Sequence, residues 1–176
     1  MLAYADGDAA AFERLYARHK GPLFRYVLRS VKARGEAEEL FQEIWMKVIE
    51  ARARYVPRAK FTTWLYTVAH NRLVDHWRVR GLTLVALDDD EESSVPEPAA
   101  APSAEPHRQA EARETLERLS AALAALPLAQ REAFLLHYEG DLTAGEIAAA
   151  TGTNEEAAKS RLRYAMNKLR EAIGDD

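Results

Sequence analysis

Residues 143–163 read TAGEIAAATGTNEEAAKSRLR, and no other stretch constrains the fold as tightly. Thr143 followed by Glu146 is the signature of a capping box, which predicts that a helix begins here. Gly152 supplies the positive φ that can end this helix and start a turn. Ala148, four residues earlier, is small enough to let two helices approach closely. The stretch therefore predicts two helices joined by a tight turn, the pattern of a helix-turn-helix.

The helix after the turn is the candidate reader of DNA. Thr153–Glu156 predicts a second capping box, which opens a helix reaching about Ile173. From Lys159 to Arg170 this helix has five basic residues and no acid. Such side chains can donate to phosphates and to guanine edges in the major groove; the alternative is a solvated charged face. The candidate contact residues are Asn154, Lys159, Ser160, Arg161, Arg163 and Tyr164.

A second functional signal lies at residues 61–80, which read FTTWLYTVAHNRLVDHWRVR. Residues 52–80 hold seven Arg or Lys and one acid, with aromatic rings interspersed. Cations attract phosphate, and exposed rings offer stacking surfaces for unpaired bases. The alternative is core packing, which is the better interpretation for Leu65, Val68 and Leu73. The candidate contact residues here and in the preceding loop are Arg58, Lys60, Phe61, Trp64, Asn71, Arg72, His76 and Arg78.

Apolar residues recur at helical spacing on both sides of an acidic, proline-rich stretch, which predicts an all-α fold. Residues 87–106 hold four prolines, an acidic run and almost no large apolar side chain. They cannot bury enough surface to offset the entropy of ordering. We therefore expect two small helical domains, residues 1–81 and 109–176, joined by a flexible acidic Pro/Ala-rich linker at 82–108. The strand-like run at 82–87 is not expected to form a strand.

The first domain is expected to hold about four helices. One spans Ala9–Lys32, where Gly21–Pro22 allows a break, another spans Glu36–Ala53, and a third opens at Phe61/Thr62. Helical spacing places one side of the second of these helices in the core: Leu40, Phe41, Ile44, Trp45, Val48 and Ile49. The opposite side carries Glu39, Gln42, Glu43 and Met46.

Composition excludes several classes of protein. The 176-residue chain has no cysteine, which removes disulfides and thiolate sites and suits a reducing cytoplasm. Its N-terminus does not read as a signal peptide, and no apolar run approaches the roughly 20 residues of a membrane helix. His70 and His76 lack the i, i+4 spacing of a helical metal site, and no phosphate-binding glycine loop is present. We expect a cytoplasmic protein without catalytic residues, metal, cofactor or membrane insertion.

Taken together, three motifs in this order resemble those of RNA polymerase sigma factors of the extracytoplasmic-function (ECF) group. EAEELFQEIWMKV, residues 36–48, is similar to the polymerase-binding helix of that family. FTTWLYTVAHNRLVDHWR, residues 61–78, is similar to its promoter-melting and minus-ten-reading helix. Residues 126–171 are similar to its region four, which reads the minus-thirty-five element. The resemblance spans nearly the whole chain apart from the linker.

The resemblance implies a role for each candidate set. Trp64 and Asn71 fall on positions associated with strand opening and the flipped minus-ten base, and residues 55–61 on the base-capturing loop; an amide can bond the exposed edge of such a base. The candidate reader helix falls on the minus-thirty-five recognition helix. The implied partners are core RNA polymerase, promoter DNA, and an anti-sigma factor or another regulator. The implied polymerase-binding surface is Glu39, Leu40, Gln42, Glu43, Trp45 and Met46.

The chain departs from the family at the start of the reader helix. Glu156-Ala157-Ala158 stands where many members have a Gly-Thr-Val type sequence. Acids there favour the helix dipole but repel phosphate, so the minus-thirty-five sequence cannot be carried over. Asp75 likewise leaves the minus-ten preference open. The alternative function is a helix-turn-helix regulator that does not bind polymerase. This alternative does not explain the aromatic and basic segment at 61–80 or the polar face from Glu39 to Met46.

Overall fold

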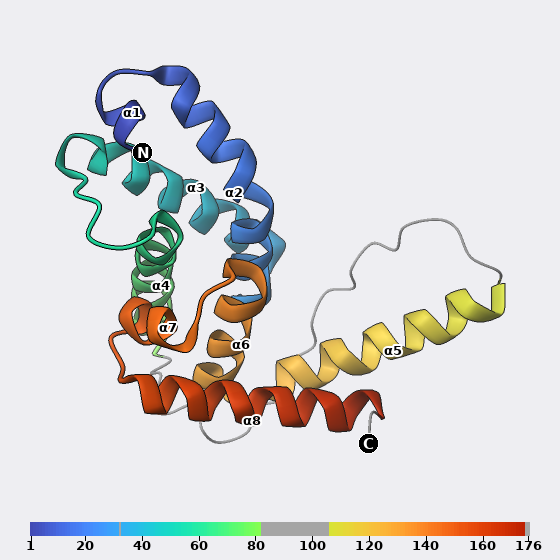
Figure 1. Cartoon of the computed structure of the whole chain (residues 1–176). Coiled ribbons are helices and arrows are strands. Elements are labelled where there is room, and N and C mark those ends of the chain that lie inside the picture. The colour runs from blue at the N-terminus through green and yellow to red at the C-terminus, as the bar shows by residue number, and fades with distance from the viewer. Residues whose placement is uncertain (32, 82–105, 175–176) are drawn as a thin grey trace.

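The described structure is built from helices (Figure 1). The computed structural model describes residues 1–31, 33–81 and 106–174, and within these ranges there is no strand, so the all-α prediction is confirmed. The expected linker lies outside the described residues, except for its last three positions, which begin α5. In chain order the helices are α1 (Leu2–Ala5), α2 (Ala9–Ser30), α3 (Arg34–Glu50), the 3-10 helix η1 (Ala51–Arg54), α4 (Phe61–Val79), α5 (Pro106–Ala125), α6 (Leu128–Gly140), α7 (Ala144–Thr151) and α8 (Glu155–Ile173).

Helices α2, α3 and α4 pack around the core of the first domain. On α3 the buried residues recur three and four apart, which is the spacing of one helix face. The Trp45 ring lies among other aromatic rings, with centroids 5.9 Å from Phe12 and 4.9 Å from Tyr16. The large side chains that are fully buried in this domain are Leu23, Tyr26, Val27, Ile44, Val48, Leu65, Tyr66 and Leu73.

Helices α6, α7 and α8 form the second domain, and α5 runs along α8 (Figure 1). The Thr143 hydroxyl accepts from the Glu146 backbone N–H while the Glu146 carboxylate accepts from the Thr143 N–H, so the capping box is confirmed. Gly152 ends α7 with φ of 67°, as the turn requires. The predicted helix-turn-helix is therefore formed by α7 and α8.

Two local expectations were wrong, and a break that the sequence allowed does not occur. Helix α2 continues through Pro22 without a break, because packing of the next residues outweighs a proline cost of about 3 kcal/mol. The helix predicted to end at Ala53 changes to 3-10 geometry after Glu50. Helix α8 is capped by Asn154, whose side chain accepts from the Ala157 N–H at 2.8 Å, and not by a capping box on Thr153.

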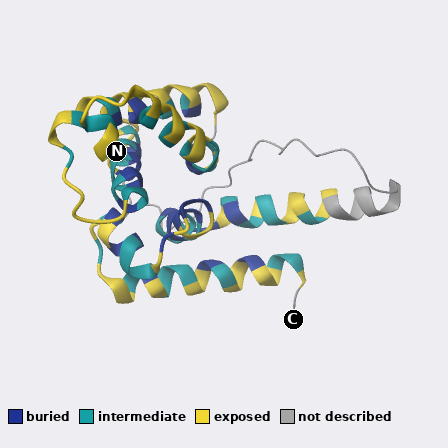
Figure 2. Ribbon diagram, turned by 45° about the horizontal axis from the view of Figure 1, so that its top comes forward, coloured by how far each residue is buried: buried dark blue, intermediate teal, exposed yellow. Residues whose placement is uncertain are grey.

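The two domains pack directly against each other. Helix α6 contacts α2 and α4, and α7 contacts α4 (Figure 1). Figure 2 shows that the buried residues line the inner faces of the helices, while exposed residues follow their outer faces. This arrangement brings α7 beside the first turn of α4.

Candidate nucleic-acid interface

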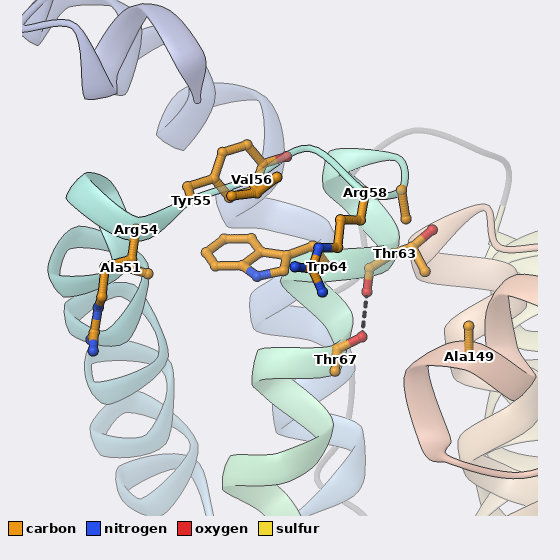
Figure 3. A pocket seen from close by; sticks show the side chains of 10 residues that line it. Ala51, Arg54, Tyr55, Val56, Arg58, Thr63, Trp64, Thr67 and Ala149 are labelled. Carbon is orange, nitrogen blue, oxygen red and sulfur yellow. Dashed lines mark hydrogen bonds between the residues drawn. The ribbon is translucent and has the colours of Figure 1, made fainter.

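A pocket of about 400 Å³ opens where the loop at residues 55–60 leads into α4. Two rings form one side of it: the Tyr55 and Trp64 centroids are 4.9 Å apart with the planes at 77°. Figure 3 shows these rings next to each other, with Ala149 of α7 on the opposite side. We call this the α4 pocket; its lining is Ala51, Arg54, Tyr55, Val56, Arg58, Ala59, Thr63, Trp64, Thr67 and Ala149.

Trp64 is half-buried, which separates it from the core residues of α4. Its ring also lies 5.7 Å from Phe61, which is half-buried too, so one side of the indole is supported and the other borders the pocket. Trp77, on the same helix, is only 4% exposed and belongs to the core. The α4 pocket can therefore offer an aromatic surface to a planar ligand such as a base.

Basic side chains surround the α4 pocket. Arg54 and Arg58 line it and are exposed. Lys60 is exposed as well, but its ammonium lies 2.9 Å from the Glu146 carboxylate of α7. The hydrogen bond to Glu146 raises the pKa of Lys60, so the amine stays charged. In this arrangement the second domain neutralises one of the cations that would attract phosphate.

The remaining candidate residues of α4 differ in whether their side chains are already engaged in ion pairs. Asn71 is exposed and lies two turns after Trp64 on the same side of the helix. Arg72 bonds Glu43 of α3, and Arg78 lies 3.4 Å from Asp75.

His76 is largely covered and lies 3.6 Å from Glu36 of α3. Burial lowers the pKa of His76, and the positive charge of Arg80 lowers it further. The ring is therefore neutral at pH 7 and supplies no cation for phosphate.

The exposed side of α3 carries the polar surface expected from the sequence. Glu39, Gln42, Glu43 and Met46 are exposed, and they border an open hollow of about 610 Å³ together with Lys47, Glu50, Arg72 and Asp75. We call these four exposed residues the α3 face.

Leu40 and Trp45 were grouped with the α3 face, but they are 2% and 4% exposed and lie in the core. The assignment of these two residues as contact residues is therefore wrong. They share α3 with the exposed set but point to its buried side.

The N-terminal half of α8 combines exposed cations with acids. Lys159 lies 2.9 Å from Glu155 and 3.1 Å from Glu156, and these hydrogen bonds raise its pKa. Arg163 and Tyr164 are exposed, with the guanidinium 5.9 Å from the ring. Of the remaining candidates, Ser160 and Arg161 are half-buried, and the Asn154 side chain is engaged in the cap.

Sequence reasoning missed two features. Arg54 lines the α4 pocket and was not predicted, and Tyr55 had been placed only as the first residue of the base-capturing loop, with no role of its own; an aromatic residue just ahead of a basic loop was the available signal. The contacts that join the domains, which centre on Glu132 and Glu139, had no signal in the local sequence.

Comparison with known families assigns the class. Residues 15–83 match the model of Sigma-70 region 2, and residues 116–169 match that of Sigma-70, region 4. The first match runs from within α2 through α4 and the second from within α5 into α8, so this is an RNA polymerase sigma factor.

Curated relatives narrow the class. The chain is 31% identical over 175 residues to RNA polymerase sigma factor CarQ of Myxococcus xanthus, covering 99% of this chain and 96% of the relative. It is 32% identical over 168 residues to ECF RNA polymerase sigma factor RpoE of Cereibacter sphaeroides, covering 93% and 87%. The protein belongs to the ECF RNA polymerase sigma factors, as the motifs predicted; this is not an enzyme family.

Solved structures support the fold. The sigma factor RpoE of Bartonella quintana, in complex with the anti-sigma factor NepR, superposes with a TM-score of 0.74 at 23% identity, covering 94% of this chain and 98% of that one. CnrH, in complex with the cytosolic domain of CnrY, gives 0.67 at 21% identity, covering 99% and 96%. Across the described ranges, no helix is long and apolar enough to cross a membrane.

Proposed function

We propose that the protein binds core RNA polymerase through the α3 face and directs initiation at promoters that its two domains read separately. The α4 pocket and Asn71 hold an unpaired base of the minus-ten element. The exposed donors of α8, with Arg163 foremost, bind the minus-thirty-five duplex.

The observation that carries this proposal is the open, half-aromatic pocket at the start of α4. A side chain serving only the core would be covered on all sides, as Trp77 is. Trp64 instead borders a cavity that is lined by Tyr55 and surrounded by Arg54 and Arg58. Stacking on an aromatic ring with a nearby cation is how proteins hold unpaired bases without needing a full base-edge readout.

The α3 face supports the polymerase assignment. Two acids, an amide and a half-exposed methionine lie together beside a hollow, and Met46 is 53% exposed. Exposed methionine beside charged groups suits an adaptable protein contact better than a purely solvated face does. We further infer that an anti-sigma factor or another regulator binds this protein, since the similar sigma factor RpoE was solved in complex with the anti-sigma factor NepR. We place the protein in the cytoplasm, where core polymerase works, and assign it no catalytic step.

The test is association with core polymerase after charge reversal on the α3 face. Glu39→Lys/Glu43→Lys should reduce co-purification with core at least tenfold. The matched control is Glu114→Lys/Glu117→Lys, which makes the same charge change at exposed positions of α5. Thermal melting should show both variants folded. Normal core binding by the α3 variant would contradict the assignment and favour the helix-turn-helix regulator that does not bind polymerase.

A further inference from the structure

Helix α6 carries two carboxylates that are buried at the contact between the two domains. Glu132 and Glu139 are 4% and 7% exposed and lie two turns apart on one side of the helix. Their described side-chain partners belong to the first domain. The Tyr26 hydroxyl donates to Glu132 at 2.9 Å and His70 Nδ1 lies 2.6 Å from it.

Glu139 is held by two arginines of α2. Arg25 Nε lies 2.8 Å from one of its oxygens and Arg29 Nη1 lies 2.7 Å from the other. A buried carboxylate is unfavourable unless it is paired and hydrogen-bonded, so these groups favour this one docked arrangement over a looser apolar contact.

The backbone at the end of α6 fits closely against α4. The Tyr66 hydroxyl donates to the Glu139 carbonyl at 3.1 Å. A Cβ added to Gly140 would lie 2.8 Å from the Tyr66 ring and 2.7 Å from the Leu142 side chain. Glycine is thus the residue that allows this approach.

Docking places α7 against the α4 pocket. Ala149 of α7 is part of the pocket lining (Figure 3), and Glu146 of α7 pairs with Lys60 of the loop. The second domain therefore restricts the surface that was assigned to the minus-ten base.

The docked arrangement also cannot span a promoter. Elements named for positions minus ten and minus thirty-five lie about 25 base pairs apart, which is roughly 85 Å at about 3.4 Å per base pair. A compact chain of this length is roughly 40 Å across. The domains must separate before both elements can be bound.

We propose that Glu132, Glu139 and their partners in the first domain form a latch that keeps the free protein closed, with α7 over the α4 pocket, until the domains separate. The proposal rests on the function proposed above for that pocket. Opening exposes both carboxylates to water and frees Arg25 and Arg29 together.

The test measures domain separation in the free, full-length protein. Because the chain has no cysteine, Ala17→Cys on α2 and Ala121→Cys on α5 provide two specific sites for nitroxide labels. Double electron–electron resonance then reports the distance between the domains. Hydroxyl-radical oxidation of Tyr55 and Trp64, read by mass spectrometry, reports access to the α4 pocket.

Two variants open the latch in different ways. Glu132→Gln/Glu139→Gln removes the charges, and Gly140→Ala pushes against Tyr66 without changing charge. The matched control is Glu38→Gln/Glu171→Gln, which removes one exposed carboxylate from each domain. Circular dichroism identifies any variant that does not fold. If one of the two latch-opening variants does not fold, the other is used for the test.

The parent and the control should give one short distance population, and the openers a broad, longer one. We expect the ratio of closed to open molecules to fall about tenfold in the openers. A much larger fall is not expected, because Arg25 is half-exposed and solvent weakens its ion pair with Glu139. Oxidation of Trp64 should rise severalfold in the openers. An unchanged distance, or a longer distance without increased oxidation, would overturn the latch. Neither polymerase nor DNA is present, so this failure is separate from failure of the proposed function.

Discussion

Replacing two tryptophans of α4 separately distinguishes a functional ring from a structural one. Trp77 is 4% exposed, so Trp77→Ala leaves a core cavity and should cost about 3–5 kcal/mol in the free energy of unfolding. Trp64 is half-buried and contacts two rings, Tyr55 at 4.9 Å and Phe61 at 5.7 Å. Each ring pair contributes about 0.5–1.5 kcal/mol beyond area burial, and this half-buried ring loses less buried area than Trp77, so Trp64→Ala should cost less than Trp77→Ala.

The two variants should rank in the opposite order when promoter opening is measured. Trp64→Ala removes the stacking surface, worth roughly 1–3 kcal/mol per base, so its open-complex yield should fall by about tenfold or more. Trp77→Ala should open promoters nearly normally at a temperature where it stays folded. The assay is permanganate footprinting with core polymerase, run beside urea unfolding of each variant.

A template with a pre-melted bubble separates opening from docking. It should restore much of the yield lost by Trp64→Ala, because strand separation is then supplied in advance. Equal open-complex yields for Trp64→Ala and the parent would refute the assignment. So would a stability loss for Trp64→Ala as large as that for Trp77→Ala, because the ring would then be a core residue.

Three further changes test local features of the structure. Lys60 is the largest cause of the lowered pKa of Glu146, which is about 2, so Lys60→Met should raise that pKa toward its ordinary 4.5 in an NMR titration of the carboxyl carbon. The sign follows: this pair stabilises the docked state above pH 4.5 and is lost as pH falls through about 2. Thr143→Ala removes the capping box and should cost about 0.5–2 kcal/mol by thermal melting, with Thr143→Ser nearly neutral. Glu156→Gln should raise duplex affinity and steepen its salt dependence, because it removes an acid beside Lys159; unchanged affinity would mean that this turn does not approach phosphate.

Features specified by neighbouring residues were predictable from the sequence. The capping box at Thr143 and the left-handed turn at Gly152 formed where expected, because a side chain and a backbone group only three or four residues away determine each one. Two adjacent capping candidates, Thr153 and Asn154, could not be ranked in the same way. Either can accept from the next turn, and the packing of α8 decides which residue is the first outside the helix.

The site was predicted less completely, because helical spacing gives the sides of a helix but not their neighbours. Leu40 and Trp45 matched the family motif as well as Glu39 did, yet their side of α3 faces the core. His76 read as a cation among basic residues, but its surroundings hold it neutral.

The contacts between the domains were beyond local reasoning. Glu132 meets Tyr26 across 106 residues, and Glu139 meets Arg25 across 114. Carboxylates on an amphipathic helix are normally predicted to be exposed to solvent. No residue within a few turns of Glu132 or Glu139 indicates that they are buried.

The measurement closest to the central claim is run-off transcription on a library of genomic fragments, with purified core polymerase and this protein. The account predicts transcripts from a limited set of fragments that share two elements at a fixed spacing, and their loss with Glu39→Lys/Glu43→Lys. Core polymerase alone should yield none of these transcripts. If the folded protein adds no transcript to those of core alone, the account of this chain as a promoter-specificity subunit is contradicted.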